Sequence, residues 1–246
     1  MIKRSLNVKI FLLSGALISW LILSLTQVWA LDPCLGRVCK ADKTVIQRKA
    51  LNDDNNLPLV NRFDFYVLAL TWSPEFCQRS RNASQQCAEN KNLGFVVHGL
   101  WPQYYHGYPL YCSNETYLSQ NNTSQALKQF PSEKLARYEW RKHGVCSGKT
   151  LSGYLEDISI ARRLFKIPQA LLYPKDDRII KTMTLYEDFL KVNASLHSGM
   201  FSINCRNGAL AEVRVCISKN LRHYQLCPQV LRNSCKMPDI FIPSSH

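Results

Sequence analysis

The hydrophobic pattern along this chain predicts three strands. Residues Phe63–Trp72 form an aromatic and β-branched run with little charge, and Leu93–His98 form a second apolar run that stops at Gly99 and Pro102. Runs of this kind are typical of strands that are covered on both faces. Residues Leu210–Ile217 alternate between apolar and polar side chains, which predicts a third strand.

Three other segments have helical spacing. Glu133–His143 follows Ser132, a residue type that favours the N-cap, and precedes Gly144, which favours a C-terminal stop. Tyr154–Phe165 and Leu185–Leu196 show similar patterns. We therefore expect at least three helices among the strands.

The remaining segments indicate loops and a single domain. The chain is rich in turn-forming residues between Pro102 and Pro131, which predicts a long loop, and the cysteine-punctuated C-terminal segment predicts another. Strands and helices are mixed without a βαβ rhythm or a repeat, so we expect one α+β domain. The sequence has neither a Gly-rich phosphate-binding loop nor a nucleophile elbow, which argues against nucleotide hydrolases and serine hydrolases.

The N-terminal residues have the order of a secretory signal peptide. Lys3, Arg4 and Lys9 precede an uncharged apolar run, and small side chains follow it near residue 30. We expect residues 1–30 to be cleaved; an uncleaved anchor helix is the alternative. Because no later run is long enough to span a bilayer, the mature chain is expected to be periplasmic or secreted, without stable membrane association. Residues 31–58 predict an irregular N-terminal extension, which leaves residues 59–246 for the folded domain.

Charge and cysteine content narrow the partners and the compartment. The formal charge is +13, and a surplus of this size suggests a polyanionic partner, either nucleic acid or an anionic membrane surface. The ten cysteines are an even number suited to five disulfides in an oxidising compartment. No CxxC pair occurs, which argues against a zinc site, and no metal or cofactor is expected.

Two short segments carry candidate chemistry. The first, FVVHGLWP, places His98 at the end of a buried strand, next to a glycine and to Trp101. The second, YEWRKHG, places Glu139, Lys142 and His143 on one face of a helix, with the intervening tryptophan directed to the core. Each segment alone also fits an ordinary structural role, as a packed histidine or a solvated ion pair. Together, in an exported basic protein, two histidines and a lysine suit acid–base cleavage of an RNA phosphodiester.

The two segments resemble the active-site segments of the ribonuclease T2 family, HGLWP and HEW-x-KHG-x-C, in order, separation and the cysteine after the second segment. The opening strand, which ends LTWSP before Cys77, is most similar to bacterial periplasmic members. The resemblance runs from Phe63 to the C-terminus. It implies an α+β domain with a central, mainly antiparallel sheet, packed helices and disulfides. It also implies a monomer that cleaves single-stranded RNA without a metal and does not cleave DNA.

The resemblance assigns a role to each matching residue. It implies that His143 is the general base for the 2′-hydroxyl and that His98 is the general acid for the leaving oxygen. Glu139 and Lys142 would polarise the phosphoryl group and stabilise the transition state. Trp101 would offer a ring face to a base.

One position departs from the family. Tyr138 stands where the family commonly has a histidine that binds phosphate. A tyrosine cannot carry positive charge at working pH, so we expect an active but weaker enzyme that depends more on Lys142, and on Arg141 if the helix turns it inward. The alternatives are a catalytically weakened or inactive relative that binds RNA or signals as a secreted protein, and a basic protein of membrane or heparin surfaces.

The family also implies a disulfide pattern. Four pairs follow from it, and the two remaining cysteines are left as a local bridge in the extension. The expected pairs are Cys77–Cys87, Cys112–Cys146, Cys205–Cys235, Cys216–Cys227 and Cys34–Cys39.

Overall fold

The computed structural model describes residues 60–80, 85–88, 91–113, 120–172 and 174–245. The chain divides into two units, residues 1–43 and 44–246, and every described residue belongs to the second. The predicted signal peptide, the predicted extension and the Cys34–Cys39 bridge lie outside the described residues.

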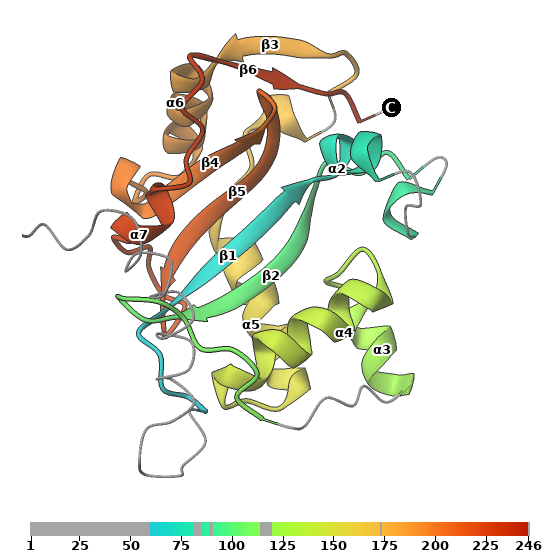
Figure 1. Cartoon of the computed structure of the whole chain (residues 1–246), viewed down its shortest axis with the longest axis vertical. Helices are drawn as coiled ribbons and strands as arrows, with labels where there is room; N and C mark the ends of the chain where they lie inside the picture. Colours follow the sequence, from blue (N-terminus) through green and yellow to red (C-terminus); the bar gives the residue numbers. More distant parts are fainter. Residues whose placement is uncertain (1–59, 81–84, 89–90, 114–119, 173, 246) are drawn as a thin grey trace, which may run out of the picture. The chain divides into compact units, whose positions relative to one another are not determined.

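Six strands form one mixed sheet in which most neighbours are antiparallel (Figure 1). The strands are β1 (Phe65–Trp72), β2 (Phe95–Gln103), β3 (Arg178–Lys181), β4 (Phe201–Arg206), β5 (Ala209–Ser218) and β6 (Asp239–Ile242). Their order is β2-β1-β5-β6-β3, with β4 also paired to β5, and the β5–β6 pair is parallel. The expected α+β fold with a mainly antiparallel sheet is confirmed.

Helices surround this sheet. The α-helices are α2 (Ser73–Arg79), α3 (Gln120–Ala126), α4 (Glu133–Lys142), α5 (Leu151–Leu164), α6 (Thr182–Val192) and α7 (Pro228–Leu231). Short 3₁₀ turns are η1 (Gln85–Cys87), η2 (Gly144–Ser147), η3 (Gln169–Leu171) and η4 (Ser198–Met200). The predicted N-cap of α4 is present, because the Ser132 hydroxyl accepts a hydrogen bond from the Leu135 N–H at 3.3 Å. Helix α3 interrupts the predicted long loop, and α7 and β6 occupy the predicted C-terminal loop.

Strand β2 corrects the prediction that the second strand stops at Gly99. It continues through Gly99 and Pro102, and because β2 is an edge strand, a proline is tolerated there. The pairing with β1 shifts at this point: Gly99 lies opposite Ala69, whereas Val97 lies opposite Leu70. His98 is therefore the extra residue of a β-bulge in the middle of the strand, not a residue at its end.

The two faces of the central strands differ. The apolar face packs on α5, whose Tyr154 hydroxyl donates to the carbonyl of Leu100 at 2.8 Å (Figure 1). The other face has a small apolar cluster at one end, with Val67 and Val230 beside Trp101. Towards its centre this face is polar, and it holds the candidate site.

Four disulfides staple the described domain, and all four pairs implied by the family pattern are confirmed. They are Cys77–Cys87, Cys112–Cys146, Cys205–Cys235 and Cys216–Cys227. Cys112–Cys146 ties the segment before α3 to η2, which directly follows α4. Of the helices in the described ranges, none is long and apolar enough to cross a membrane.

Candidate active site

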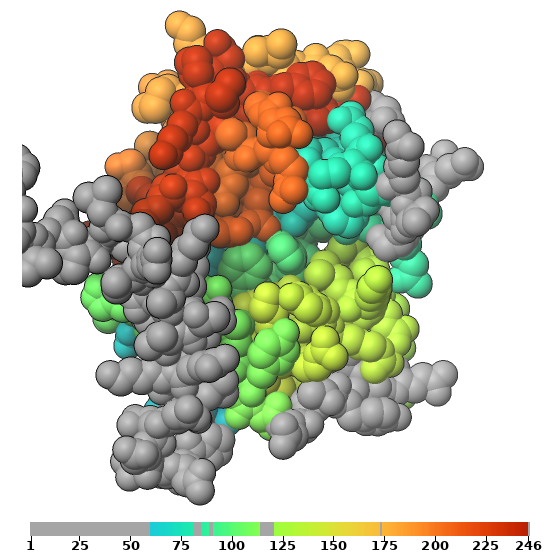
Figure 2. Space-filling model, viewed as in Figure 1, coloured from blue at the N-terminus to red at the C-terminus, as the bar shows by residue number. Residues whose placement is uncertain are grey.

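The polar face of the sheet is hollowed between α4 and the strands β4 and β5 (Figure 2). A cavity of about 380 Å³ adjoins a larger one of about 690 Å³, and the two share His98, Tyr138 and Arg214. All six predicted catalytic and substrate-binding residues line the smaller cavity: His98, Trp101, Tyr138, Glu139, Lys142 and His143.

The β-bulge explains how β2 supplies two side chains to one cavity. Side chains of a regular strand alternate between faces, so residues three apart, such as His98 and Trp101, would point to opposite faces. The extra residue at His98 changes this phase, and both side chains line the cavity. Their ring centroids are 5.1 Å apart, in an edge-to-face arrangement.

His98 lies between two carboxylates. Its Nδ1 is 2.6 Å from Oε2 of Glu212, and its Nε2 is 3.6 Å from Oε1 of Glu139. Burial lowers the pKa of His98, but the hydrogen bond and charge of Glu212 and the charge of Glu139 outweigh burial, so the pKa is raised above its usual 6.5. The ring is thereby stabilised in its protonated form.

Glu139 of α4 is the buried carboxylate of the site, with 1% of its surface exposed. Its Oε2 accepts a hydrogen bond from Nε1 of Trp101 at 2.6 Å. Burial raises the pKa of Glu139, against the opposing effects of His98, the Trp101 hydrogen bond and Lys142. A Cβ on Gly99 would collide with both atoms of this hydrogen bond, so the glycine makes room for it.

His143 follows the last residue of α4 and caps the helix, which is one residue shorter than predicted. Its backbone N–H donates to the carbonyl of Glu139 at 2.9 Å, and its ring lies 5.4 Å from that of Trp101. Burial, with the charges of Lys142 and His98, holds the pKa of His143 well below 6.5. The imidazole is therefore stabilised as the neutral base. Its buried Nδ1 has no hydrogen-bond partner among the described residues.

Lys142 and Tyr138 interact at the rim of the cavity. The Lys142 ammonium donates to the Tyr138 hydroxyl at 2.8 Å, and the tyrosine is exposed. Burial lowers the pKa of Lys142, but the hydrogen bond to Tyr138 contributes to a net raised pKa, so the amine stays charged. Arg141 is exposed and lines neither cavity, whereas Trp140 is buried in the core as expected.

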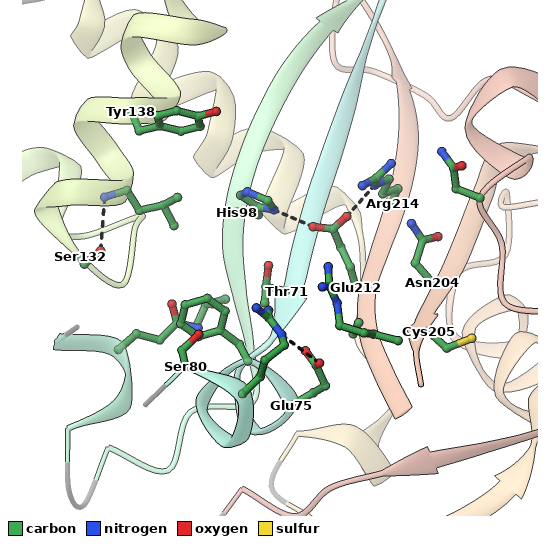
Figure 3. A pocket seen from close by; sticks show the side chains of 18 of the residues that line it. Thr71, Glu75, Ser80, His98, Ser132, Tyr138, Asn204, Cys205, Glu212 and Arg214 are labelled. Atoms are coloured by element: carbon green, nitrogen blue, oxygen red, sulfur yellow. Dashed lines mark hydrogen bonds and ion pairs between the residues drawn. The ribbon is translucent and has the colours of Figure 1, made fainter. Parts of the chain in front are cut away.

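Two site residues were missed from the sequence, Glu212 and Arg214 of β5 (Figure 3). Arg214 donates from Nε to Oε1 of Glu212 at 2.6 Å, and its guanidinium lies 5.2 Å from the ring centre of Trp101. Burial raises the pKa of Glu212, but the His98 hydrogen bond and Arg214 hold it below its usual value. The sequence does contain a signal for these two residues. Glu212 and Arg214 are charged and two positions apart in a mostly apolar strand, so both side chains lie on the same face of the sheet.

The arrangement places an imidazole stabilised in its neutral form, an imidazole stabilised in its protonated form and an ammonium group around one cavity. That set can remove a proton, deliver a proton and stabilise negative charge. Among the residues that the structure describes, no group of three or more His, Cys, Asp or Glu side chains is arranged to hold a metal ion.

Comparison with known proteins gives sequence relatives over part or most of the chain. A ribonuclease of Aeromonas hydrophila is 48% identical over 86 residues, or 35% of this chain and 39% of that protein. A "probable ribonuclease" of Haemophilus influenzae is 36% identical over 124 residues, or 44% of this chain and 46% of that protein. This chain thus spans less than half the length of these two relatives. Ribonuclease DdI of Dictyostelium discoideum is 30% identical over 194 residues, or 70% of this chain and 82% of that protein.

Solved structures share the fold. The RNase-related protein from Calystegia sepium superposes with a TM-score of 0.61 at 22% identity, over 75% of this chain and 98% of that chain. A mutant of RNase MC1, in complex with 5′-UMP, superposes with a TM-score of 0.56 at 18% identity, over 72% of this chain and 97% of that chain. The family model of ribonuclease T2 matches residues 63–227, which include both motif segments and more than half of the sequence. The chain belongs to the ribonuclease T2 family.

Proposed function

We propose that this protein is an endoribonuclease that cleaves single-stranded RNA by transphosphorylation. The observation that carries the proposal is the pair His98 and His143, which line one cavity with pKa values displaced in opposite directions. A reaction that removes one proton and delivers another needs such a pair.

In the first step, neutral His143 takes the proton of the ribose 2′-hydroxyl, and the 2′-oxygen attacks the adjacent phosphorus. The bond from phosphorus to the 5′-oxygen breaks, and protonated His98 gives its proton to that oxygen. The products are a 2′,3′-cyclic phosphate end and a free 5′-hydroxyl. The Lys142 ammonium stabilises the charge on the phosphoryl oxygens, and Glu139 takes part in polarising the phosphoryl group.

In the second step, the two histidines exchange roles. His98, now neutral, takes a proton from water, whose oxygen attacks the cyclic phosphate. His143, now protonated, gives its proton to the departing 2′-oxygen. DNA lacks the 2′-hydroxyl nucleophile, so the proposed chemistry does not cleave it.

Substrate binding would combine charge and stacking. Trp101 and Tyr138 line the cavity and are the proposed contacts for base and phosphate. The surplus of Lys and Arg over Asp and Glu, which remains after residues 1–30 are removed, favours RNA and predicts binding that weakens as salt is raised. We further propose that the protein acts as a monomer in the periplasm or outside the cell.

The test is digestion of RNA and of DNA by the purified protein in excess chelator. We expect loss of RNA alone, abolished in His98→Ala and in His143→Ala. His223→Ala is the matched control, because His223 is exposed and lines neither cavity. Cleavage of DNA, or full RNA cleavage by either cavity variant, contradicts the proposal. RNA binding without turnover by the wild type supports the inactive RNA-binding alternative.

A further inference from the structure

We infer that Glu212 is a positioning residue for His98, because it accepts the hydrogen bond from Nδ1 and so directs Nε2 into the cavity. The inference deepens the proposed function and rests on it, since the ring that Glu212 holds is the proposed acid. The geometry is specific: Nδ1 is 2.6 Å from Glu212 and Nε2 is 3.6 Å from Glu139. The ring is therefore oriented between β5 and α4.

The sheet brings these two residues together across an intervening strand. His98 is on β2 and Glu212 is on β5, with β1 between them, a separation of roughly 9–10 Å for two strand spacings. The β1 residues below them are small: Thr71 lies opposite Glu212, and Ala69 lies opposite Gly99. Two long side chains can therefore meet above β1. The bulge at His98 directs that ring to this face.

Arg214 fixes the carboxylate of Glu212. Oε1 of Glu212 accepts from Arg214 at 2.6 Å, while Oε2 serves His98, so the two oxygens have separate partners. Glu212 is buried, with 8% of its surface exposed, and its pKa is held low. A buried, ionised carboxylate whose two oxygens each accept a hydrogen bond has little freedom to rotate. Glu212 is therefore a rigid acceptor for His98.

The charged groups around His98 determine what loss of Glu212 would do. Strand β5 contributes Glu212, which raises the pKa of His98, and Arg214, which lowers it; α4 contributes Glu139, which raises it. Lys142 of α4 and His143, which follows it, line the same cavity as His98, and the charges of His98 and His143 interact. Helix α2 contributes Glu75 to the larger cavity, where it is paired with Arg79 at 3.3 Å. Removing the charge of Glu212 leaves burial and Arg214 opposed only by Glu139. The pKa of His98 should then fall.

The experiment measures kcat/KM for RNA against pH in the full chain. Protonated His98 is the acid, so its pKa sets the basic limb of the profile. We expect Glu212→Gln to move that limb to lower pH by about one unit or more and to lower kcat at least about tenfold. Glu212→Asp keeps the negative charge, but its shorter side chain holds the carboxylate farther from His98. The basic limb of its pH profile should therefore stay near that of the wild type, while kcat falls. Glu75→Gln is the control, a buried glutamate with an arginine partner, and its basic limb should not move.

An NMR titration of the His98 ring in the same variants separates this inference from the proposed function. We expect the His98 pKa to lie above 6.5 in the wild type and to fall in Glu212→Gln. Superimposable titrations overturn the inference whether or not the protein cleaves RNA, and a wild type without RNA cleavage overturns the proposed function alone. If Glu212→Gln does not fold, Glu212→Asp serves as the test. A kcat of Glu212→Asp equal to that of the wild type overturns the positioning role.

Discussion

Replacing Gly99 with alanine should break the hydrogen bond between Trp101 and Glu139. The added methyl group would occupy the space of the Glu139 Oε2 and Trp101 Nε1 atoms, which are bonded at 2.6 Å. Neither group can move freely, because the Trp101 ring contacts the rings of His98 and His143 and Glu139 has 1% of its surface exposed. Water therefore cannot replace the lost donor without an opening of the site.

The magnitude follows from the type of bond. A hydrogen bond to a charged group contributes about 1.5–3 kcal/mol, and a buried acceptor left without its donor loses that contribution. For a domain of this size, about 2 kcal/mol corresponds to a Tm lower by roughly 4–8 °C. Activity should fall more, because Oε1 of Glu139 is 3.6 Å from His98. A displacement of about 1 Å at such a group is expected to lower kcat/KM by about 10- to 100-fold.

Thermal unfolding and RNA-cleavage kinetics measure both effects. Gly153→Ala is the matched control: its added methyl would lie 3.5 Å from the Lys149 Cβ, an ordinary contact, inside α5. Gly153 lies in the first turn of α5, where alanine favours the helix over glycine, so this control should keep its activity and at least its Tm. If Gly99→Ala matches Gly153→Ala in both measurements, the cavity accommodates the methyl group and the reasoning is wrong.

Three further predictions concern charge and cross-links. Tyr138→His should raise kcat/KM below neutral pH, because a histidine there can carry positive charge; equal profiles for variant and wild type would contradict this. Replacing Cys112 and Cys146 together with alanine should lower the free energy of unfolding by about 2–5 kcal/mol, measured by urea denaturation; an unchanged urea midpoint would refute it. The histidine pKa shifts predict that stability declines on both sides of pH 6.5. The raised pKa of His98 gives a contribution that is present below 6.5 and lost as pH rises through its folded value. The lowered pKa of His143 gives one that is present above 6.5 and lost as pH falls towards its folded value. Urea unfolding of wild type, His98→Ala and His143→Ala across pH isolates these contributions, and identical pH dependence in all three would count against them.

Local signals predicted the elements that depend on local physics. The buried runs became β1 and β2, and the capping serine with the helical spacing located α4 to within one residue. The strands β3, β4 and β6 were missed because they have only four to six residues and depend on neighbouring strands for their stability. Their pattern alone carries too little information.

The candidate site was predicted in its residues but not in its assembly. The two motif segments supplied six of the residues that line the smaller cavity, whereas Glu212 is 114 positions from His98 and meets it only through the order of strands. The bulge was also missed, because an irregularity of pairing depends on the partner strand, here the step between Ala69 and Leu70. The register between two strands depends on how distant segments pair in the fold, so the sequence of one strand alone does not predict it.

Strand β2 consists of two segments that meet at the bulge, where the alternation of side chains between the two faces of the sheet shifts by one residue. Transplanting its eight-letter motif into an evenly paired ribbon would turn one aromatic ring inward and leave the other outside, although every letter had been preserved. Protein engineers who wish to move this site must therefore copy the irregular pairing together with the residues that it displays.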